Sequence, residues 1–411
     1  MSAGLFDKFA PLRGALRDLV GNGASPFGVP VDRVLSPTEA IIGGRPTILA
    51  GTFNYLGLTF DSACVAAGKG ALDRDGTGTT GSRIANGNYS AHGEIEQALA
   101  RFLGRRSVML FTTGYQANLG ILSTVVGPED YVLLDADCHA SIYDGLKMGN
   151  ATVIRFRHND AEDLDRRLQR LAGEKGDKLI VLEGIYSMLG DRAPLKEMVE
   201  VKRRHGGAYL LIDEAHSLGV LGARGRGLAE AEDCESEVDF VVGTFSKSLG
   251  AIGGYCASDH PDFGVLRIAC RPYMYTASLP PSVVASCLTA LRQVETRPEL
   301  MQNLWRNAQR FHGALTALGF TLCAEPSPIV SVRLPDPATA YAFWRELLDS
   351  GVFVTLAVPP ATPNGWCILR SSVCAAHTDQ QIERMVEIFR QVAARLGLRT
   401  AKAPIGQVVG A

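Results

Sequence analysis

Three short segments carry side chains that can do chemistry, and each follows an apolar run. LLDADCHAS contains His139, LLIDEAHSLG contains Asp213 and His216, and VVGTFSKSLGAIGG contains Lys247. Open parallel sheets place their sites beyond the carboxyl ends of the strands, so these groups are expected to meet in one crevice. Lys247 lies among small residues that let backbone approach a flat ligand. A lysine in this setting suits a Schiff base, because burial favours its neutral, nucleophilic form.

Each of these residues also has an ordinary structural explanation. A single Asp at the end of a strand commonly caps a helix or forms a turn. A lone His is usually structural, and Lys247 stands between two serines, as many solvated surface lysines do. The combination of three such segments, rather than any one of them, favours a functional site.

Two motifs are rejected because their surroundings do not fit. Gly76–Gly81 matches G-x-G-x-x-G, but a dinucleotide site needs an apolar strand before the turn, and here GKGALDRD precedes it. That motif is better explained as a turn that brings backbone close to a ligand or partner. Asp213–His216 spells DEAH, as in one class of helicases, yet the chain lacks the G-x-x-x-x-G-K-[ST] phosphate loop of such enzymes.

Apolar runs that alternate with amphipathic segments predict the elements that position these residues. Six strands are predicted between about residues 50 and 290, separated by segments with an apolar residue at every third or fourth position. They are Val108–Phe111, Tyr131–Asp135, Thr152–Phe156, Lys178–Glu183, Tyr209–Asp213 and Phe240–Thr244. This alternation predicts an α/β domain whose mainly parallel sheet is covered by helices.

The pattern changes after about residue 285. A long helix is predicted around Leu304–Leu318, with further helices over Ala338–Leu348 and Asp379–Leu396 and strands over Ile329–Leu334 and Cys367–Ser371. The chain is therefore divided into an N-terminal helical segment (1–50), a large domain (51–285), a smaller α+β domain (286–399) and a tail (400–411). The first twenty residues predict an amphipathic helix that packs on the body or on a partner subunit, or that touches a membrane surface.

Composition excludes several classes of protein. Among the 411 residues, 41 Lys and Arg stand against 43 Asp and Glu, which gives no support to nucleic-acid binding through a broad basic face. No apolar run approaches the roughly 18 residues of a membrane-spanning helix. The nine cysteines are dispersed and include no C-x-x-C pair, which favours reduced thiols in the cytoplasm over disulfides or a metal site.

Taken together, DADCHAS, DEAHSLG and GTFSKSLG resemble the α-oxoamine synthases, fold-type-I enzymes that depend on pyridoxal 5′-phosphate (PLP). The resemblance covers nearly the whole chain. It extends through NYLGL (Asn54–Leu58), GTGTTGSR (Gly76–Arg83), FTTGYQANLG (Phe111–Gly120), EGIYSMLGD (Glu183–Asp191), RPYMYTASLPP (Arg271–Pro281) and PPATPNG (Pro359–Gly365). It implies a mainly parallel, seven-stranded sheet covered by helices and a smaller α+β C-terminal domain.

The resemblance also implies roles for the residues of the cofactor site. Lys247 would bind PLP as a Schiff base, and Asp213 would pair with the pyridine nitrogen and keep it protonated. His216 would hydrogen-bond the phenolic oxygen of the ring, and His139 would stack on its face. The phosphate would be held by Gly114, Tyr115, Thr244 and Ser246. Thr276 would reach the phosphate of the neighbouring subunit, which implies a homodimer with shared active sites.

Three further residues match positions that contact the amino-acid substrate in this family. Arg370 would hold the substrate carboxylate with its planar fork, and Asn54 would lie near the same carboxylate. Ser82 stands where members specific for glycine carry threonine, and this smaller residue is consistent with L-serine. Val358 departs from the pattern, because related members tend to carry an arginine there in a mobile loop over the substrate.

The runs HASIYDG, GTFSKS and TASLPPSVVA look most like members that condense L-serine with a long-chain acyl thioester. That reaction releases CO₂ and gives 3-ketodihydrosphingosine, the first step of sphingolipid biosynthesis. The acyl donor is palmitoyl-CoA or an acyl carrier protein thioester. The family also includes 8-amino-7-oxononanoate synthase, 2-amino-3-ketobutyrate CoA ligase and 5-aminolevulinate synthase, which share the catalytic residues. Outside it, an aminotransferase would use the same lysine and aspartate without releasing CO₂, and a cofactor-free protein with a structural lysine would be colourless.

Overall fold

The computed structural model describes residues 4–21, 23 and 25–398, which form two compact units. The large unit consists of residues 53–187 and 191–305, and the small unit of the described residues up to 52, 188–190 and 306–398. The predicted domain boundaries stay predictions. The units group the first 52 residues with the C-terminal part of the chain, and the predicted tail (400–411) lies outside the described residues.

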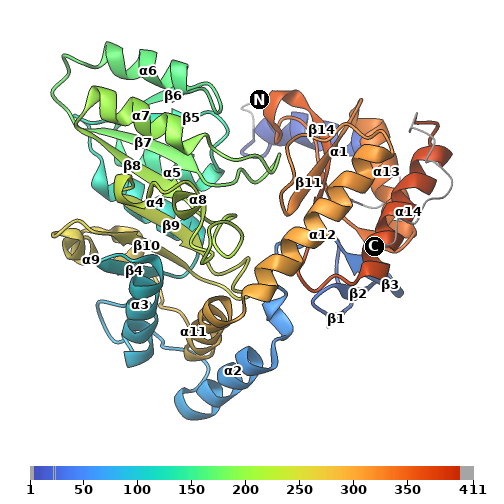
Figure 1. Ribbon diagram of the computed structural model, residues 1–411, viewed down its shortest axis with the longest axis horizontal. Coiled ribbons are helices and arrows are strands. Elements are labelled where there is room, and N and C mark those ends of the chain that lie inside the picture. The colour runs from blue at the N-terminus through green and yellow to red at the C-terminus, as the bar shows by residue number, and fades with distance from the viewer. Residues whose placement is uncertain (1–3, 22, 24, 399–411) are drawn as a thin grey trace. The chain divides into compact units, whose positions relative to one another are not determined.

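A seven-stranded sheet forms the centre of the large unit (Figure 1). In spatial order its strands are β4 (Ser107–Phe111), β10 (Gly254–Ser258), β9 (Phe240–Thr244), β8 (Ala208–Asp213), β7 (Lys178–Glu183), β5 (Tyr131–Asp135) and β6 (Thr152–Phe156). β10 runs antiparallel to both of its neighbours, β4 and β9, and the remaining pairs are parallel. The six predicted strands and the fold class are confirmed. β10 is not among the predicted strands, because GYCAS follows a glycine-rich turn and lacks a continuous apolar run.

The large unit also contains helices, several of which connect the strands of this sheet. They are α2 (Ser62–Asp75), α3 (Ser90–Leu103), α4 (Gly114–Val125), α5 (Ala140–Gly149), α6 (Ala161–Arg170), α7 (Leu195–His205) and α11 (Pro281–Thr296), with the short α8 (Leu228–Ala231), α9 (Leu266–Ala269) and α10 (Arg271–Met274). Short 3₁₀ helices occur at Leu58–Phe60, Glu235–Glu237 and Phe263–Val265. Every residue of β7 after Lys178 is buried, so both faces of the central strands are covered, as a parallel sheet requires.

Two smaller sheets belong to the small unit. One has the order β1 (Arg33–Ser36), β2 (Glu39–Ile42), β3 (Arg45–Leu49), β12 (Val352–Phe353), and the other β11 (Ile329–Leu334), β14 (Cys367–Ser372), β13 (Thr355–Ala357). The predicted helices correspond to α12 (Pro298–Ala317), which runs across the boundary between the units, α13 (Pro337–Asp349) and α14 (Asp379–Arg395), with a 3₁₀ turn at Pro363–Gly365. The core contains Phe311, Phe343, Trp344 and Phe389.

Only the first part of the 1–50 segment, expected to be helical, forms a helix. Asp7–Phe9 is a 3₁₀ turn, α1 spans Ala10–Val20 and buries no side chain, and the chain then continues as β1, β2 and β3. Gly43 and Gly44, both with positive φ, connect β2 to β3 in a tight hairpin. This turn chemistry, with β-branched residues on both sides, outweighs the helical expectation.

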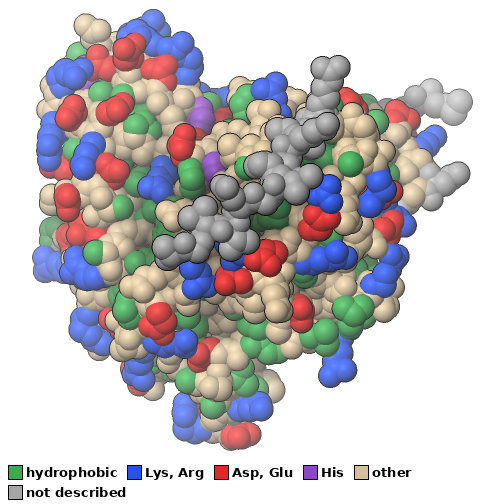
Figure 2. Space-filling model, turned by 45° about the vertical axis from the view of Figure 1, so that its right-hand side comes forward, with side chains coloured by type: hydrophobic (Ala, Val, Ile, Leu, Met, Phe, Trp, Pro, Cys, Tyr) green, Lys and Arg blue, Asp and Glu red, His purple; other side chains and the backbone are tan. Residues whose placement is uncertain are grey.

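Acidic and basic side chains are interspersed over the face of the molecule shown in Figure 2, in keeping with the near balance of charge. All nine cysteines are free thiols, and eight of them are buried. Within the described part of the chain, no helix is both long and apolar enough to cross a membrane.

Candidate active site

Asp213 is the last residue of β8, and its carboxylate is buried and fixed by two donors. Its Oδ2 accepts a hydrogen bond from Asn118 Nδ2 at 2.6 Å, and its Oδ1 accepts one from the backbone N–H of Ala215 at 2.9 Å. A buried carboxylate needs such partners, because desolvation without them is costly. Asn118 was not predicted; the available signal is an amide within the mainly apolar segment ANLGIL of α4.

A chain of hydrogen bonds connects Asp213 to His139. Asn118 Nδ2 also donates to Ser141 Oγ at 3.0 Å, and Ser141 Oγ lies 2.8 Å from His139 Nδ1. His139 is the N-cap of α5, and its Nδ1 accepts the backbone N–H of Ser141. The backbone N–H of His139 donates to Glu183 Oε1, at the end of β7. Two neighbouring strand ends therefore orient the imidazole, as the strand pattern predicts.

The charges around His139 and Glu183 affect one another. Solvent reaches His139, but the surrounding protein partly desolvates the imidazole, and this desolvation lowers its pKa. The nearby charge of Asp213 raises that pKa, and the charge of Lys247 lowers it. Burial raises the pKa of Glu183 well above its usual value, and the nearby charge of Asp213 raises it further. The arrangement favours a neutral imidazole and a protonated Glu183 near the carboxylate of Asp213, which accepts hydrogen bonds.

His216 and Lys247 lie around two aromatic side chains of the NYLGL region. The buried His216 has its Nδ1 2.7 Å from the hydroxyl of Tyr55, and its ring meets the Phe53 ring edge to face, with centroids 5.3 Å apart. Lys247 is half-buried, and its Nζ lies 5.9 Å from the centre of the Phe53 ring. Phe53 and Tyr55 were not predicted as site residues, although the NYLGL run was.

The N-terminus of α4 lies against the end of β9. Gly114 is the first residue of the helix, and a Cβ placed on it would lie 2.8 Å from the Cβ of Thr244, so a larger residue would push the two elements apart. Thr244 Oγ1 lies 2.9 Å from the hydroxyl of the exposed Ser246. The first N–H groups of a helix have no intrahelical partner, and together with these hydroxyls they suit a phosphate.

Tyr115 and Thr276 lie next to this helix terminus. Tyr115 is exposed, its hydroxyl donates to Asp144, and this hydrogen bond raises the pKa of the phenol. Its ring lies 6.5 Å, edge-on, from the ring of His139. Thr276 Oγ1 accepts a hydrogen bond from Gln116 Nε2, in the first turn of α4, at 3.2 Å. The predicted phosphate residues thus gather at one end of one helix.

The predicted substrate residues are divided between the two units. Asn54 Nδ2 donates to Thr59 Oγ1 at 2.8 Å, and Ser82 is half-buried in the segment between α2 and α3. Arg370 belongs to the small unit, where it is 7% exposed in the central strand β14. Val358, also in the small unit, follows β13 and packs against the core of that unit. The roles of these residues in binding substrate stay predictions.

The donors and acceptors in the large unit fit PLP. The site offers an amine at Lys247, a buried carboxylate at Asp213, a histidine beside Tyr55, and helix N–H groups next to hydroxyls. Gly114 approaches Thr244 closely and has no side chain, so no side chain of the helix stands at this point of the α4 terminus. This set matches an aldehyde, a ring nitrogen, a phenolic oxygen and a phosphate.

Comparisons with known proteins agree with this geometry. The family described as aminotransferase class I and II matches residues 50–389. The serine palmitoyltransferase of Caulobacter vibrioides is 60% identical over 395 residues, covering 96% of this chain and 98% of that protein. A high-resolution structure of serine palmitoyltransferase with PLP has a TM-score of 0.94 at 52% identity, covering 96% of this chain and 100% of that one. The 8-amino-7-oxononanoate synthase of Geobacter metallireducens is 36% identical, covering 88% and 92% of the two chains.

Proposed function

Because the chain belongs to the aminotransferase class I and II family, and within it to the α-oxoamine synthases, we propose that it is a PLP-dependent serine palmitoyltransferase. It condenses L-serine with palmitoyl-CoA or another long-chain acyl thioester and releases CO₂ and the free thiol. The product is 3-ketodihydrosphingosine, the first committed intermediate of sphingolipids. The observation that carries the proposal is the buried Asp213, held by Asn118 at 2.6 Å and connected to His139 on one side of the Lys247 site.

The large unit supplies the residues that hold the cofactor. Lys247 would bind the PLP aldehyde, Asp213 would pair with the ring nitrogen, His216 would bond the phenolic oxygen, and His139 would contact the ring. Bound PLP supplies an electron-poor ring that stabilises negative charge developing at the substrate Cα. The Asp213 carboxylate keeps that ring protonated, and Asn118 holds the carboxylate in place, so the electron sink is oriented before substrate arrives.

Lys247 has a second role once serine has displaced it. Its free amine removes the proton from the serine Cα, which then attacks the thioester carbonyl and expels the thiol. Arg370 and Asn54 hold the substrate carboxylate until it leaves as CO₂, and the vacated carbon takes up a proton. His139 would help hold the substrate in its reactive orientation, a task for which a neutral imidazole is suited.

We also propose a homodimer in which Thr276 reaches the phosphate bound by the other subunit. Thr276 bonds Gln116 of its own chain at 3.2 Å, so the support for a second subunit is the neighbouring Tyr275, whose 70% exposed side chain leaves this surface open to a partner. Sedimentation equilibrium of the PLP-loaded protein measures the mass. A monomer that retains full activity would contradict a shared site.

We propose that the enzyme is cytoplasmic and makes a peripheral contact with the membrane. Phe6, before the 3₁₀ turn, and Leu12, in α1, are 72% and 64% exposed, and α1 also carries Arg13 and Arg17. The segment from Phe6 through α1 therefore offers apolar side chains beside basic groups. At the membrane the enzyme would meet an acyl substrate that dissolves in lipid. Co-sedimentation with anionic lipid vesicles should fall when Phe6 and Leu12 are both replaced by Ser, and equal co-sedimentation of the two proteins would refute the contact.

The function is tested by incubating the PLP-loaded protein with L-serine and palmitoyl-CoA and measuring ¹⁴CO₂ and free thiol. Lys247→Ala should abolish both, whereas Lys175→Ala, at an exposed loop position, should not. Pairing serine, alanine and glycine with thioesters of different length separates this activity from those of 8-amino-7-oxononanoate synthase and 2-amino-3-ketobutyrate CoA ligase. Amino-group transfer to a keto acid without CO₂ would identify an aminotransferase instead.

A further inference from the structure

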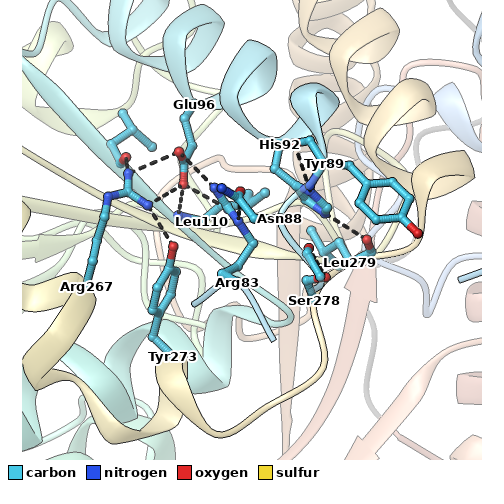
Figure 3. A network of polar contacts seen from close by, with 12 residues as sticks. Arg83, Asn88, Tyr89, His92, Glu96, Leu110, Arg267, Tyr273, Ser278 and Leu279 are labelled. Carbon is cyan, nitrogen blue, oxygen red and sulfur yellow. Dashed lines mark hydrogen bonds and ion pairs between the residues drawn. The ribbon is translucent and has the colours of Figure 1, made fainter. Parts of the chain in front are cut away.

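A nearly buried carboxylate outside the cofactor site binds two arginines from distant parts of the chain (Figure 3). Glu96, in α3, receives both terminal nitrogens of Arg83 at 3.0 and 3.2 Å and both of Arg267 at 3.1 and 3.0 Å. The backbone N–H of Leu110 in β4 donates to the same carboxylate at 3.0 Å. Five donors thus converge on one side chain, in the two-point geometry that arginine forms with carboxylates.

The two arginines belong to segments that carry predicted site residues. Arg83 directly follows Ser82 in the segment 76–89, here named the Ser82 segment. Arg267 precedes the segment 271–280, here named the Thr276 segment, and donates to the hydroxyl of its Tyr273 at 2.8 Å. Both guanidinium groups lie 5.8 Å from the centre of the Tyr273 ring. Glu96 therefore connects the Ser82 segment to the Thr276 segment and both of them to β4.

Direct hydrogen bonds join the two segments beyond this carboxylate. Ser278 donates through its backbone N–H to Gly81 O at 2.9 Å and through its hydroxyl to Gly87 O at 2.6 Å. His92, one turn before Glu96 in α3, accepts the backbone N–H of Tyr89 at Nδ1, and its Nε2 lies 2.9 Å from Leu279 O (Figure 3). These hydrogen bonds join neutral groups and act only over a short distance, so they form only where the two segments are already close together.

Charge makes Glu96 the decisive member of the network. The Arg83 side chain is only 7% exposed and that of Arg267 34% exposed, so water solvates neither guanidinium well. With Glu96 present, two positive charges face one negative charge; without it, two cations would face each other in a poorly solvated place. Since a buried charge that loses its partner is strongly unfavourable, the segments would move apart.

We propose that Glu96 is a positioning residue for the reaction: by binding Arg83 and Arg267 it holds the Ser82 and Thr276 segments where the amino-acid substrate and the cofactor phosphate need them. The inference rests on the proposed function for the roles of Ser82 and Thr276. Glu96 itself touches neither group. It acts through the backbone that it fixes at Leu110, near the end of β4 and four residues before the first residue of α4.

Hydrogen exchange measured by mass spectrometry on the PLP-loaded Glu96→Gln variant tests the proposal. Glutamine keeps the size of the side chain and removes its charge. Exchange should become about tenfold faster or more in 76–89 and 271–280, and should stay unchanged in β5 and β7. The KM for L-serine should rise about tenfold while kcat stays within about threefold, because Lys247 and Asp213 are not displaced.

Asp259→Asn provides the matched control. Asp259 also accepts an arginine, Arg105 at 2.9 Å, and a backbone N–H, that of Arg106 at 2.6 Å, but it contacts neither segment. This variant should leave exchange in both segments and the KM for serine as in the natural chain. Equal exchange in Glu96→Gln and the natural chain, acceleration spread evenly over the large unit, or a loss confined to kcat would each overturn the proposal.

A second variant keeps the test decisive if Glu96→Gln does not fold. Arg83→Lys retains the positive charge but loses the two-point contact and the hydrogen bond from Nε to Asn88. It should accelerate exchange in the same two segments, to a smaller extent. Exchange is measured without turnover, so faster exchange in a protein that proves inactive on serine would refute the proposed function while leaving the positioning of the segments standing.

Discussion

Glu183 offers the sharpest test of how the strand ends position His139. It is 3% exposed at the end of β7, and its carboxyl group accepts the backbone N–H of His139. Burial raises its pKa well above the ordinary value of 4.5, and the charge of Asp213 raises it further. We therefore expect Glu183 to stay neutral to a higher pH than an ordinary carboxyl group, and its role is to accept a hydrogen bond rather than to carry charge.

Two substitutions separate these roles. Glu183→Gln keeps an acceptor of the same shape, so it should change the free energy of unfolding by less than about 1 kcal/mol at pH 6. Glu183→Leu leaves the His139 N–H without its acceptor in a buried place and should cost about 1–3 kcal/mol. It should also weaken PLP binding about tenfold, because the imidazole is no longer held at the N-cap of α5.

The pH dependence has a definite sign. A carboxyl group whose folded-state pKa is raised binds more protons in the folded than in the unfolded state between the two pKa values. The natural chain should therefore lose stability as the pH rises above about 4.5, by at most about 1.4 kcal/mol per pH unit from this group. Glutamine does not titrate, so the stability of Glu183→Gln relative to the natural chain should increase with pH.

Urea unfolding from pH 5 to 8 and PLP titration of the apoprotein measure both effects. Glu214→Leu is the matched control: Glu214 is equally buried and next to Asp213, but it accepts the backbone N–H groups of Leu228 and Ala229. Glu214→Leu should be less stable than the natural chain but should bind PLP nearly as well. The reasoning is refuted if Glu183→Gln is as unstable as Glu183→Leu at pH 6, or if Glu183→Leu binds PLP normally.

Three further predictions concern neighbouring contacts. Asn118→Ala removes the 2.6 Å donor to Asp213 and should weaken PLP binding about tenfold in equilibrium titrations, whereas Asn307→Ala, at an equally buried amide bonded to His377 O, should lower only stability. Gly114→Ala should lower PLP affinity at least about tenfold in the same titration, while Gly93→Ala, with open space around the new Cβ, should raise the melting temperature slightly. Burial opposes protonation of His158, but hydrogen bonds to Asp135 and Asp191 raise its pKa to about 10. The stability that protonated His158 contributes is complete below about pH 6.5 and is lost as the pH rises to 10. In urea unfolding, His158→Gln should therefore lose less stability than the natural chain between about pH 7 and 10.

How far sequence alone leads is visible in particular elements. β5, β7 and β9 match their predicted bounds, because a buried parallel strand must be a nearly continuous apolar run and ends where a polar residue appears. The mostly exposed edge strand β6 also matches, although Arg155 interrupts its apolar residues. The strands between residues 33 and 49 and the antiparallel β10 were not predicted, because they are short and of mixed composition. β1, β2 and β3 pair with their neighbours in the chain, whereas β10 also pairs with the distant β4. Hairpin turns and edge pairing depend on tertiary contacts that no local period records.

The same division holds at the candidate site, and it has a physical cause. Asp213, His139 and Lys247 follow strands, so their neighbourhood is implied by the parallel sheet itself. Asn118, Tyr55 and Glu96 act from helices or loops, and each matters only through a partner more than ten residues away. A polar residue on a buried helix face predicts that a partner exists, because an unsatisfied buried amide or carboxylate is costly, but it does not say which one. The orientation of the reactive groups therefore depends on residues whose importance becomes visible only once the helices are placed on the sheet.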